Sequence, residues 1–160
     1  MMIFTIGHSN LPLASFVELL RRHEITTVVD VRSQPFSSYS PQFNRDQIKT
    51  HLELNNIDYR FLGHKLGGHP ATRAFCCPDG TPDYFRIEQD ESYQQGINEL
   101  IQIAETERVA VMCSEGDFRK CHRYHLIAKT LVLRGIEVKH IQSDGSLWDN
   151  PAVQLSLEVS

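Results

Sequence analysis

Residues 108–141 carry the sequence RVAVMCSEGDFRKCHRYHLIAKTLVLRGIEVKHI, which predicts one complete βαβ unit. Residues 108–112 are a short apolar run of the kind that forms a buried strand, and residues 136–141 are a second one. Between them, residues 120–134 repeat apolar side chains at helical spacing, and Gly135 follows as a helix stop. Two strands joined through a helix are expected to lie parallel in one sheet, with a right-handed crossover.

The rest of the chain continues this alternation of strands and helices. Predicted strands cover residues 3–6, 25–31 and 59–62, and predicted helices cover 13–20, 44–54 and 84–106, the last with an early interruption. We therefore expect a single α/β domain over residues 1–160, with a mostly parallel sheet of about five strands covered by helices on both faces in a Rossmann-like, three-layer arrangement. Residues 63–83 are rich in glycine and proline and are expected to form a mobile or pocket-covering loop.

The composition is that of an ordinary globular domain, with 41% hydrophobic and 22% charged residues among 160. The formal net charge is −4 at pH 7, so the chain as a whole offers no positive surface for extended nucleic acid or anionic lipid. No stretch approaches the ~20 apolar residues that a membrane-spanning helix needs. The N-terminus also has no export signal, so a cytoplasmic location is expected. The four cysteines are then expected to be thiols rather than a disulfide framework.

In sheets of this kind, ligands bind outside the C-terminal ends of the strands, and the residues at those positions are chemically rich. After the predicted strands come Gly7, His8, Ser9 and Asn10, then Asp30, Arg32 and Ser33, then Cys113 and Glu115, with Cys121, His122 and Arg123 opening the next helix. If the three strands are neighbours, one pocket holds carboxylates, arginines, histidines and thiols together. This convergence is the main functional signal in the chain.

Cys113 is the candidate nucleophile, because it precedes a predicted helix whose positive N-terminal end would stabilise a thiolate. A buried cysteine can equally be an inert apolar residue. The spacing from Cys113 to Arg119 also fits the loop with which phosphatases and rhodaneses bind an oxyanion beside a thiolate, although Glu115 puts negative charge in that loop. His8 and His122 are candidate general acids or bases, and His8 can equally be a turn residue bonded to the backbone.

Three other patterns each allow two interpretations. Asp30 and Arg32 lie on one side of their predicted strand, where they either orient a substrate or form a buried ion pair. Gly67 and Gly68 mark a backbone that needs either positive φ or a close approach. Two of the cysteines and a histidine could hold a metal ion, but their spacing matches no zinc ribbon or finger, so no cofactor is predicted.

Basic residues also gather at this end of the predicted sheet. They are Arg32, Lys65, Arg119, Lys120 and Arg123. The net negative charge is therefore compatible with a local positive site for a small ligand.

The motifs TIGHSN (residues 5–10), DVRSQP (30–35), LGG (66–68), CSEGDFRKCHR (113–123) and HI (140–141) resemble, in this order, those of the domain of unknown function 488 family. The resemblance implies a pocket that contains Gly7, His8, Ser9, Asp30, Arg32, Gly67, Gly68, Cys113, Glu115, Cys121, His122 and Arg123, and it implies no particular reaction. Members of the family do not need an arginine at position 119, and this chain has His69 where an arginine is frequent. By this resemblance, Arg123 is the better residue for recognising an anion.

Two classes of function fit these residues. In the first, an enzyme, Cys113 is the nucleophile and Glu115 or His122 is the acid or base. Arg32 and Arg123 then hold a small anionic substrate, such as a nucleotide or a phosphorylated small molecule. The second class is a noncatalytic module that uses the same groups to bind a nucleotide or a modified base. Metal binding at a Cys/His site is a minor alternative. The sequence leaves the choice between enzyme and module open, and also the oligomeric state.

Overall fold

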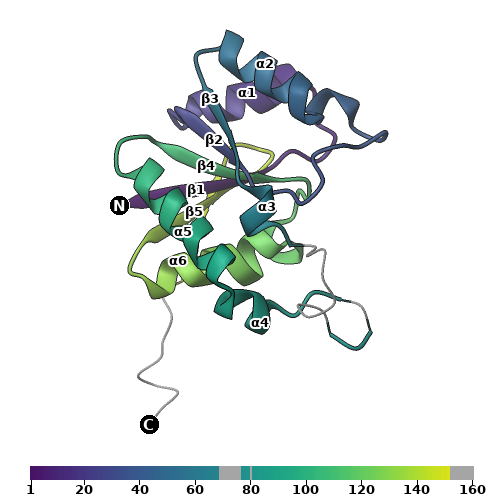
Figure 1. The fold of residues 1–160 in the computed structure, drawn as a ribbon. Helices are drawn as coiled ribbons and strands as arrows, with labels where there is room; N and C mark the ends of the chain where they lie inside the picture. Colours follow the sequence, from purple (N-terminus) through teal and green to yellow (C-terminus); the bar gives the residue numbers. More distant parts are fainter. Residues whose placement is uncertain (69–76, 80, 152–160) are drawn as a thin grey trace.

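The computed structural model describes residues 1–68, 77–79 and 81–151 (Figure 1). Its strands are β1 (Met2–Gly7), β2 (Thr27–Asp30), β3 (Asp58–Phe61), β4 (Val109–Cys113), β5 (Glu137–Ile141) and β6 (Leu147–Asp149). Its α-helices are α1 (Leu13–Arg22), α2 (Arg45–Leu54), α3 (Gly63–Leu66), α4 (Tyr84–Gln89), α5 (Glu91–Ala104) and α6 (Lys129–Leu133). Two 3₁₀ turns, η1 (Pro41–Phe43) and η3 (Phe118–Lys120), and a π-helix, η4 (Arg123–Ala128), complete the described elements.

The described strands form one sheet in the order β3-β2-β4-β1-β5-β6. All neighbours pair in parallel except β6, which pairs antiparallel with β5. The predicted α/β fold with a mostly parallel sheet is therefore confirmed, but the described sheet has six strands rather than about five. The additional strand is missing from the prediction because residues 147–149 are too few to show an alternating pattern, and it is defined by its pairing with β5.

Alternate side chains of the strands point into two separate cores. On one face of the sheet, Phe4, Val28 and Met112 pack with residues of α1 and α2. On the other face, Val29 and Val111 pack with residues of α5, η4 and α6. Figure 1 shows α1 and α2 on one side of the sheet and α5 and α6 on the other. This is the three-layer arrangement expected from the alternation of strands and helices.

The predicted helix over residues 120–134 is not continuous. It begins as η3, passes through Cys121 with an extended backbone, and continues as the π-helix η4 and then α6. The carbonyl oxygen of Leu126 accepts hydrogen bonds from the Tyr93 hydroxyl at 3.2 Å and from the Thr130 hydroxyl at 2.9 Å. A side-chain group that bonds to a helical carbonyl in this way interrupts the regular backbone hydrogen bonds of the helix and widens the turn. Thr130 belongs to this helix, but Tyr93 comes from α5, so the local sequence contains only part of the signal for the wide turn.

The predicted loop over residues 63–83 begins with the short helix α3. Residues 69–76 and 80 lie outside the described residues, so the expected cover over the pocket and the family departure at His69 fall largely there. The early interruption of the predicted helix 84–106 is confirmed, because α4 and α5 meet at Asp90, whose carboxylate caps α5. Among the described helices, none has the length and apolar character to cross a membrane.

Candidate functional site

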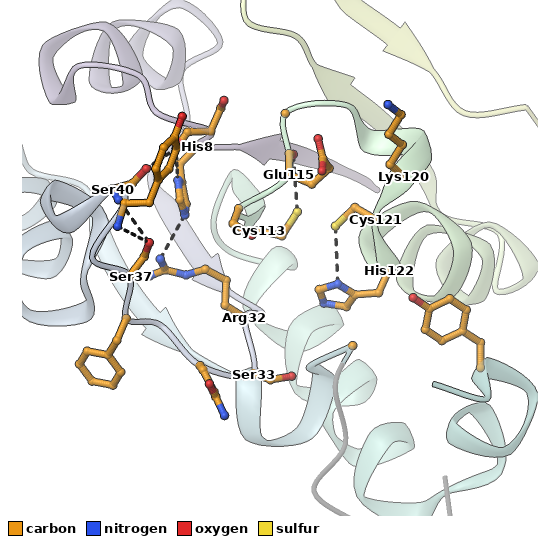
Figure 2. Close-up of a pocket in the computed structure, with 18 residues that line it drawn as sticks. His8, Arg32, Ser33, Ser37, Ser40, Cys113, Glu115, Lys120, Cys121 and His122 are labelled. Carbon is orange, nitrogen blue, oxygen red and sulfur yellow. Dashed lines mark hydrogen bonds between the residues drawn. The ribbon is translucent and has the colours of Figure 1, made fainter. Parts of the chain in front are cut away.

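Three strand ends identified from the sequence lie side by side, because β4 lies between β1 and β2. Gly7 pairs with Cys113 across β1 and β4, and Asp30 pairs with Met112 across β2 and β4. A cleft of about 860 Å³ opens beyond these strand ends (Figure 2). The loops after β1, β2 and β4 form its walls, as expected for a parallel sheet whose strand order reverses.

The structure divides the predicted site residues into two groups. Nine of them line the cleft, namely His8, Ser9, Arg32, Ser33, Gly68, Cys113, Glu115, Cys121 and His122. The other five do not line it, namely Gly7, Asn10, Asp30, Gly67 and Arg123. Each of these five contacts or closely approaches the walls. Asn10, for example, accepts a hydrogen bond from the Ser40 hydroxyl at 3.1 Å and so ties the β1 loop to the β2 loop.

Cys113 ends β4 and is 2% exposed at the floor of the cleft. Nη1 of Arg123 donates a hydrogen bond to its Sγ at 2.8 Å. Burial alone would raise the pKa of the Cys113 thiol, but the hydrogen bond from Cys121 and the charge and hydrogen bond of Arg123 outweigh it. They lower this pKa from 9.0 to about 7. A thiol with such a pKa is about half thiolate at neutral pH, and the thiolate is the nucleophilic form.

Arg123 is fully buried, and it has no carboxylate partner in the described part of the chain. Besides the Cys113 sulfur, its guanidinium donates to the backbone carbonyl oxygens of Glu115 at 2.6 Å and Gly116 at 3.4 Å. A Cβ at Gly7 would stand 1.8 Å from the Glu115 oxygen and 2.5 Å from Arg123 Nη1. Only glycine therefore lets this loop and the guanidinium pack against the end of β1. The guanidinium is directed at a sulfur rather than into the cleft, which sequence spacing did not indicate.

Cys121 also lines the cleft, next to His122 and near Cys113 (Figure 2). Its Sγ is 3.5 Å from Nδ1 of His122 and accepts the backbone N–H of Arg123 at 3.5 Å. Nε2 of His122 donates to the carbonyl oxygen of Val31 at 3.0 Å, so Nδ1 carries no hydrogen in the neutral ring and faces the Cys121 sulfur with its lone pair. The hydrogen bond to Cys113, together with burial, raises the pKa of Cys121. The two cysteines therefore differ in character, one acidic and the other held as a thiol.

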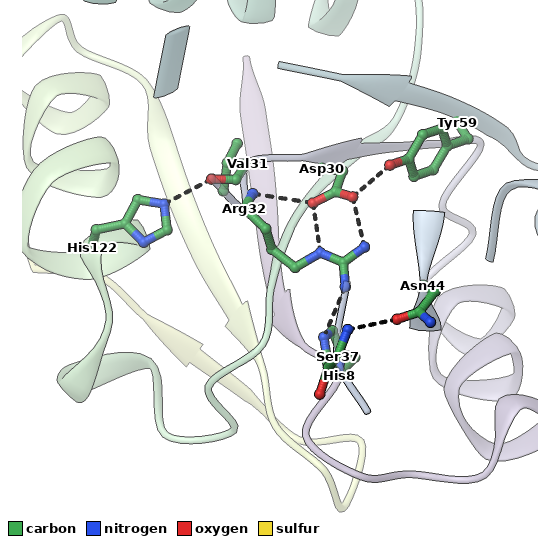
Figure 3. A network of polar contacts seen from close by, with 8 residues as sticks. All are labelled: His8, Asp30, Val31, Arg32, Ser37, Asn44, Tyr59 and His122. Carbon is green, nitrogen blue, oxygen red and sulfur yellow. Dashed lines mark hydrogen bonds and ion pairs between the residues drawn. The ribbon is translucent and has the colours of Figure 1, made fainter. Parts of the chain in front are cut away.

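A buried polar network forms the wall next to β2 (Figure 3). Asp30 accepts hydrogen bonds from the Arg32 guanidinium at 2.9 and 2.8 Å and another from the Tyr59 hydroxyl. Nη1 of Arg32 donates to Nε2 of His8 at 3.2 Å, and Nδ1 of His8 donates to the Ser9 carbonyl oxygen at 2.7 Å. Mainly because of burial, the pKa of His8 falls from 6.5 to about 4, so the ring is neutral near pH 7. Nε2 of His8 thus helps to orient Arg32, while the bond from Nδ1 to the backbone holds the ring in place.

The same network settles the geometry of Asp30 and Arg32, which form a buried ion pair at 2.8 Å. Among the other basic residues of the predicted positive site, Lys65 and Arg119 also pair with acidic side chains. Arg119 is exposed and is not among the residues that line the cleft, so the phosphatase-like pairing of Cys113 with Arg119 does not form. Lys120 lines the cleft without an ion pair among the described residues. The local positive charge is therefore smaller than the sequence suggested.

The loop after β2 supplies a wall that the predicted residue set lacked. The cleft is also lined by Gln34, Phe36, Ser37, Tyr39, Ser40, Tyr84, Ser114, Gly116 and Lys120. Phe36 is 67% exposed and Tyr39 is 79% exposed. The sequence did hold a signal here, since residues 35–41 are a run rich in serine and proline directly after a predicted strand.

The two glycines after α3 allow close approach, and neither adopts positive φ. A Cβ at Gly67 would stand 2.2 Å from the Ser33 hydroxyl oxygen, and a Cβ at Gly68 would stand 2.6 Å from the ring of His122. The described residues contain no group of three or more His, Cys, Asp or Glu side chains that could hold a metal ion. The Cys/His metal site considered from the sequence therefore has no donor set there.

A family model with the description Domain of unknown function DUF488 matches residues 12–130. The match runs from the residue before α1 into α6 and includes the ends of β2 and β4 with their loops. Comparisons with curated proteins and with solved structures gave no significant match. The description of the family states no reaction, so the chemistry has to be argued from the site itself.

Proposed function

This chain belongs to the family described as Domain of unknown function DUF488, and from its site we propose that it is an enzyme whose Cys113 thiolate attacks a small anionic substrate. One observation carries the proposal, namely the hydrogen bond of 2.8 Å from a fully buried arginine to the Cys113 sulfur. A buried guanidinium without a carboxylate partner is expensive to maintain. A cysteine with a purely structural role gains nothing from such a neighbour, whereas a nucleophilic thiolate is stabilised by it.

The other groups of the cleft support a substrate with a polar, charged part and a planar part. The Lys120 side chain has no ion pair among the described residues, so it is the group best suited to bind an anionic substituent. Phe36 and Tyr39 offer exposed rings on which a nucleobase or another planar group can stack. His122 stands beside the Cys121 thiol and is the candidate acid or base, while His8 acts through Arg32 as a positioning residue.

The test of the nucleophile is the pH dependence of alkylation at Cys113, followed with iodoacetamide and peptide mass spectrometry. We expect a rate midpoint near pH 7 for Cys113, because that is where its thiolate forms. Cys77, for which no such partner is present among the described residues, serves as the internal control. The midpoint is the right measure because restricted access lowers the rate at every pH by the same factor. A Cys113 midpoint no lower than that of Cys77 would refute the proposal.

The test of the substrate class is a melting-shift screen with nucleoside monophosphates and sugar phosphates. A probe that binds the cleft should raise the melting temperature of the wild-type protein and should lose that effect in Lys120→Ala. Lys49→Ala, which removes the same charge from the exposed surface of α2, should keep the shift. An equal shift in both variants would place the anion elsewhere.

The noncatalytic binding module remains the second candidate, because the exposed rings of Phe36 and Tyr39 would serve stacking without any chemistry. The two candidates separate on the Cys113→Ser variant. If the protein is an enzyme, Cys113→Ser still binds the substrate but converts none of it, whereas the wild-type protein does convert it. If the protein is a binding module, the variant and the wild type bind with the same affinity and neither shows turnover.

A further inference from the structure

We propose that Cys113 and Cys121 are a redox-active dithiol that reduces a small-molecule disulfide bound in the cleft. The inference rests on the proposed reactive thiolate of Cys113 and adds a second function for the same site, a transfer of two electrons. It is carried by the geometry of two cysteines and of the arginine and histidine that contact them.

Both sulfur atoms lie in the same cleft wall and face one another (Figure 2). The Cys121 thiol is near enough to Cys113 to help lower the pKa of that thiol. Arg123 holds the pair from behind, with Nη1 on the Cys113 sulfur at 2.8 Å and its backbone N–H on the Cys121 sulfur at 3.5 Å. Their exposed fractions are 2% and 7%, so the cleft is the route by which a reactant reaches them.

The backbone at Cys121 departs from regular helical geometry. Cys121 is not inside a regular helix. It lies between the 3₁₀ turn η3 and the π-helix η4, with φ −128° and ψ 150°. The proposal requires this junction to adjust when the disulfide bond forms.

The two thiols have different roles in this exchange. Cys113 is the attacking group, because its thiolate is stabilised by Arg123. Cys121 is the resolving group, with Nδ1 of His122 at 3.5 Å as the acceptor for its proton. The pKa of Cys121 is raised chiefly by its hydrogen bond to Cys113. Once Cys113 carries a covalent adduct, it no longer bears a negative charge. The pKa of Cys121 then falls, so the second step follows the first in order.

The electrons and protons balance over two steps. The Cys113 thiolate attacks one sulfur of R–S–S–R, a Cys113–S–S–R bond forms, and the first RS⁻ leaves and takes a proton from solvent. His122 then takes the proton of Cys121, whose sulfur attacks Cys113, and the second RS⁻ leaves with that proton. The protein dithiol is oxidised to a disulfide by two electrons, and R–S–S–R is reduced to two thiols. An added small-molecule dithiol reverses the protein disulfide.

The experiment uses the full chain with Cys76 and Cys77 replaced by serine and with glutathione disulfide as the probe. The reduced protein is exposed to the probe, quenched in acid, alkylated and mapped by mass spectrometry. The wild-type site should form a Cys113–Cys121 cross-link that dithiothreitol reverses. Cys121→Ser should instead accumulate a glutathione adduct on Cys113, and Cys113→Ser should give no adduct on Cys121.

His122→Gln tests the proton acceptor. It should slow the second step by at least about tenfold while leaving adduct formation on Cys113 unchanged. His125→Gln is the matched control, because the ring of His125 contacts the Arg119 carbonyl oxygen rather than the thiols.

The possible results separate this inference from the proposed function. A glutathione adduct on Cys113 that persists in the wild-type site without a cross-link would overturn the dithiol and leave the reactive thiolate intact. A Cys113 that forms neither a cross-link in the wild-type site nor an adduct in Cys121→Ser would overturn both.

Discussion

Replacing Arg123 by methionine should convert Cys113 from a thiolate into an ordinary thiol. Methionine keeps most of the length and volume of the side chain, so the core remains filled. The variant removes the charge and the hydrogen bond of 2.8 Å that oppose burial at Cys113. With burial then acting against a weaker opposing influence, the pKa of the thiol should return from about 7 to at least its ordinary value of 9.0.

The size of the effect follows from two opposing factors. At pH 7, a shift of this kind lowers the thiolate fraction from about one half to about one in a hundred, roughly 50-fold. The less stabilised thiolate is intrinsically about eight times more nucleophilic, for a Brønsted slope of about 0.45 over two pKa units. The rate of alkylation at pH 7 should therefore fall about sixfold, and at pH 10 the variant should react faster than the wild type.

The assay is the iodoacetamide rate at Cys113 between pH 5 and pH 10, with circular dichroism to verify folding. Arg119→Met is the matched control, because it removes an arginine whose partner is the exposed Asp117, and its profile should overlay the wild-type curve. Rate profiles for Arg123→Met and wild type that share one midpoint would refute the assignment of Arg123 as the group that stabilises the thiolate.

Three further predictions concern stability and close packing. Mainly through burial, the pKa of His140 falls from 6.5 to about 4, so the unfolded chain binds a proton that the native chain does not. As the pH falls from 6.5 to 4, His140 should therefore lower the free energy of unfolding, by about 2 kcal/mol at pH 5, and His140→Gln should remove that share of the profile and leave the share of His8. Asp30→Asn leaves the buried guanidinium of Arg32 without its charged partner and should destabilise the protein by about 3–5 kcal/mol in urea unfolding. As the control, Glu53→Gln breaks the exposed ion pair with Lys49 on α2 and should change stability by less than about 0.5 kcal/mol. An equal loss of stability in Asp30→Asn and Glu53→Gln would show that burial does not set the cost of breaking these ion pairs. Gly7→Ala places a Cβ 1.8 Å from the Glu115 carbonyl oxygen and 2.5 Å from Arg123 Nη1. The displaced guanidinium should stabilise the thiolate less, so the alkylation midpoint of Cys113 should move to higher pH. An unchanged midpoint would show that the loop after β4 moves aside without disturbing Arg123.

The sequence was sufficient to predict which residues gather at the candidate site, but not how deeply each side chain is buried. Apolar runs ending at Gly7, Asp30 and Cys113 predicted which residues would gather, because parallel strands present their C-terminal ends at one edge of the sheet. Spacing along a helix indicates which residues share a face and says nothing of how far a side chain is buried. For that reason Arg123 was expected in contact with a ligand, whereas the structure directs it at a sulfur.

Features that depend on contacts between distant segments were also beyond the sequence. The strand β6 exists through its pairing with β5, and the expected positive site is reduced by acidic partners such as Glu99, which lies far along the chain from Lys65. The aromatic wall of Phe36 and Tyr39 was visible only as a loop rich in serine and proline. A loop sequence gives few indications of which of its side chains turn toward a cleft.

The π-helix η4 sets how the residues before it are rotated about the helix axis relative to the residues after it. Downstream of it, Leu131 faces the core, and upstream of it Cys121 and His122 face the cleft. Removing one residue from the wide turn would restore regular α-helical winding and rotate everything upstream by about 100° relative to the core. The arginine would then point away from Cys113, while the strands of the sheet and the core against α1 and α2 kept their composition. A single-codon deletion in this turn would therefore separate folding from reactivity, a distinction that most point substitutions in the site cannot make.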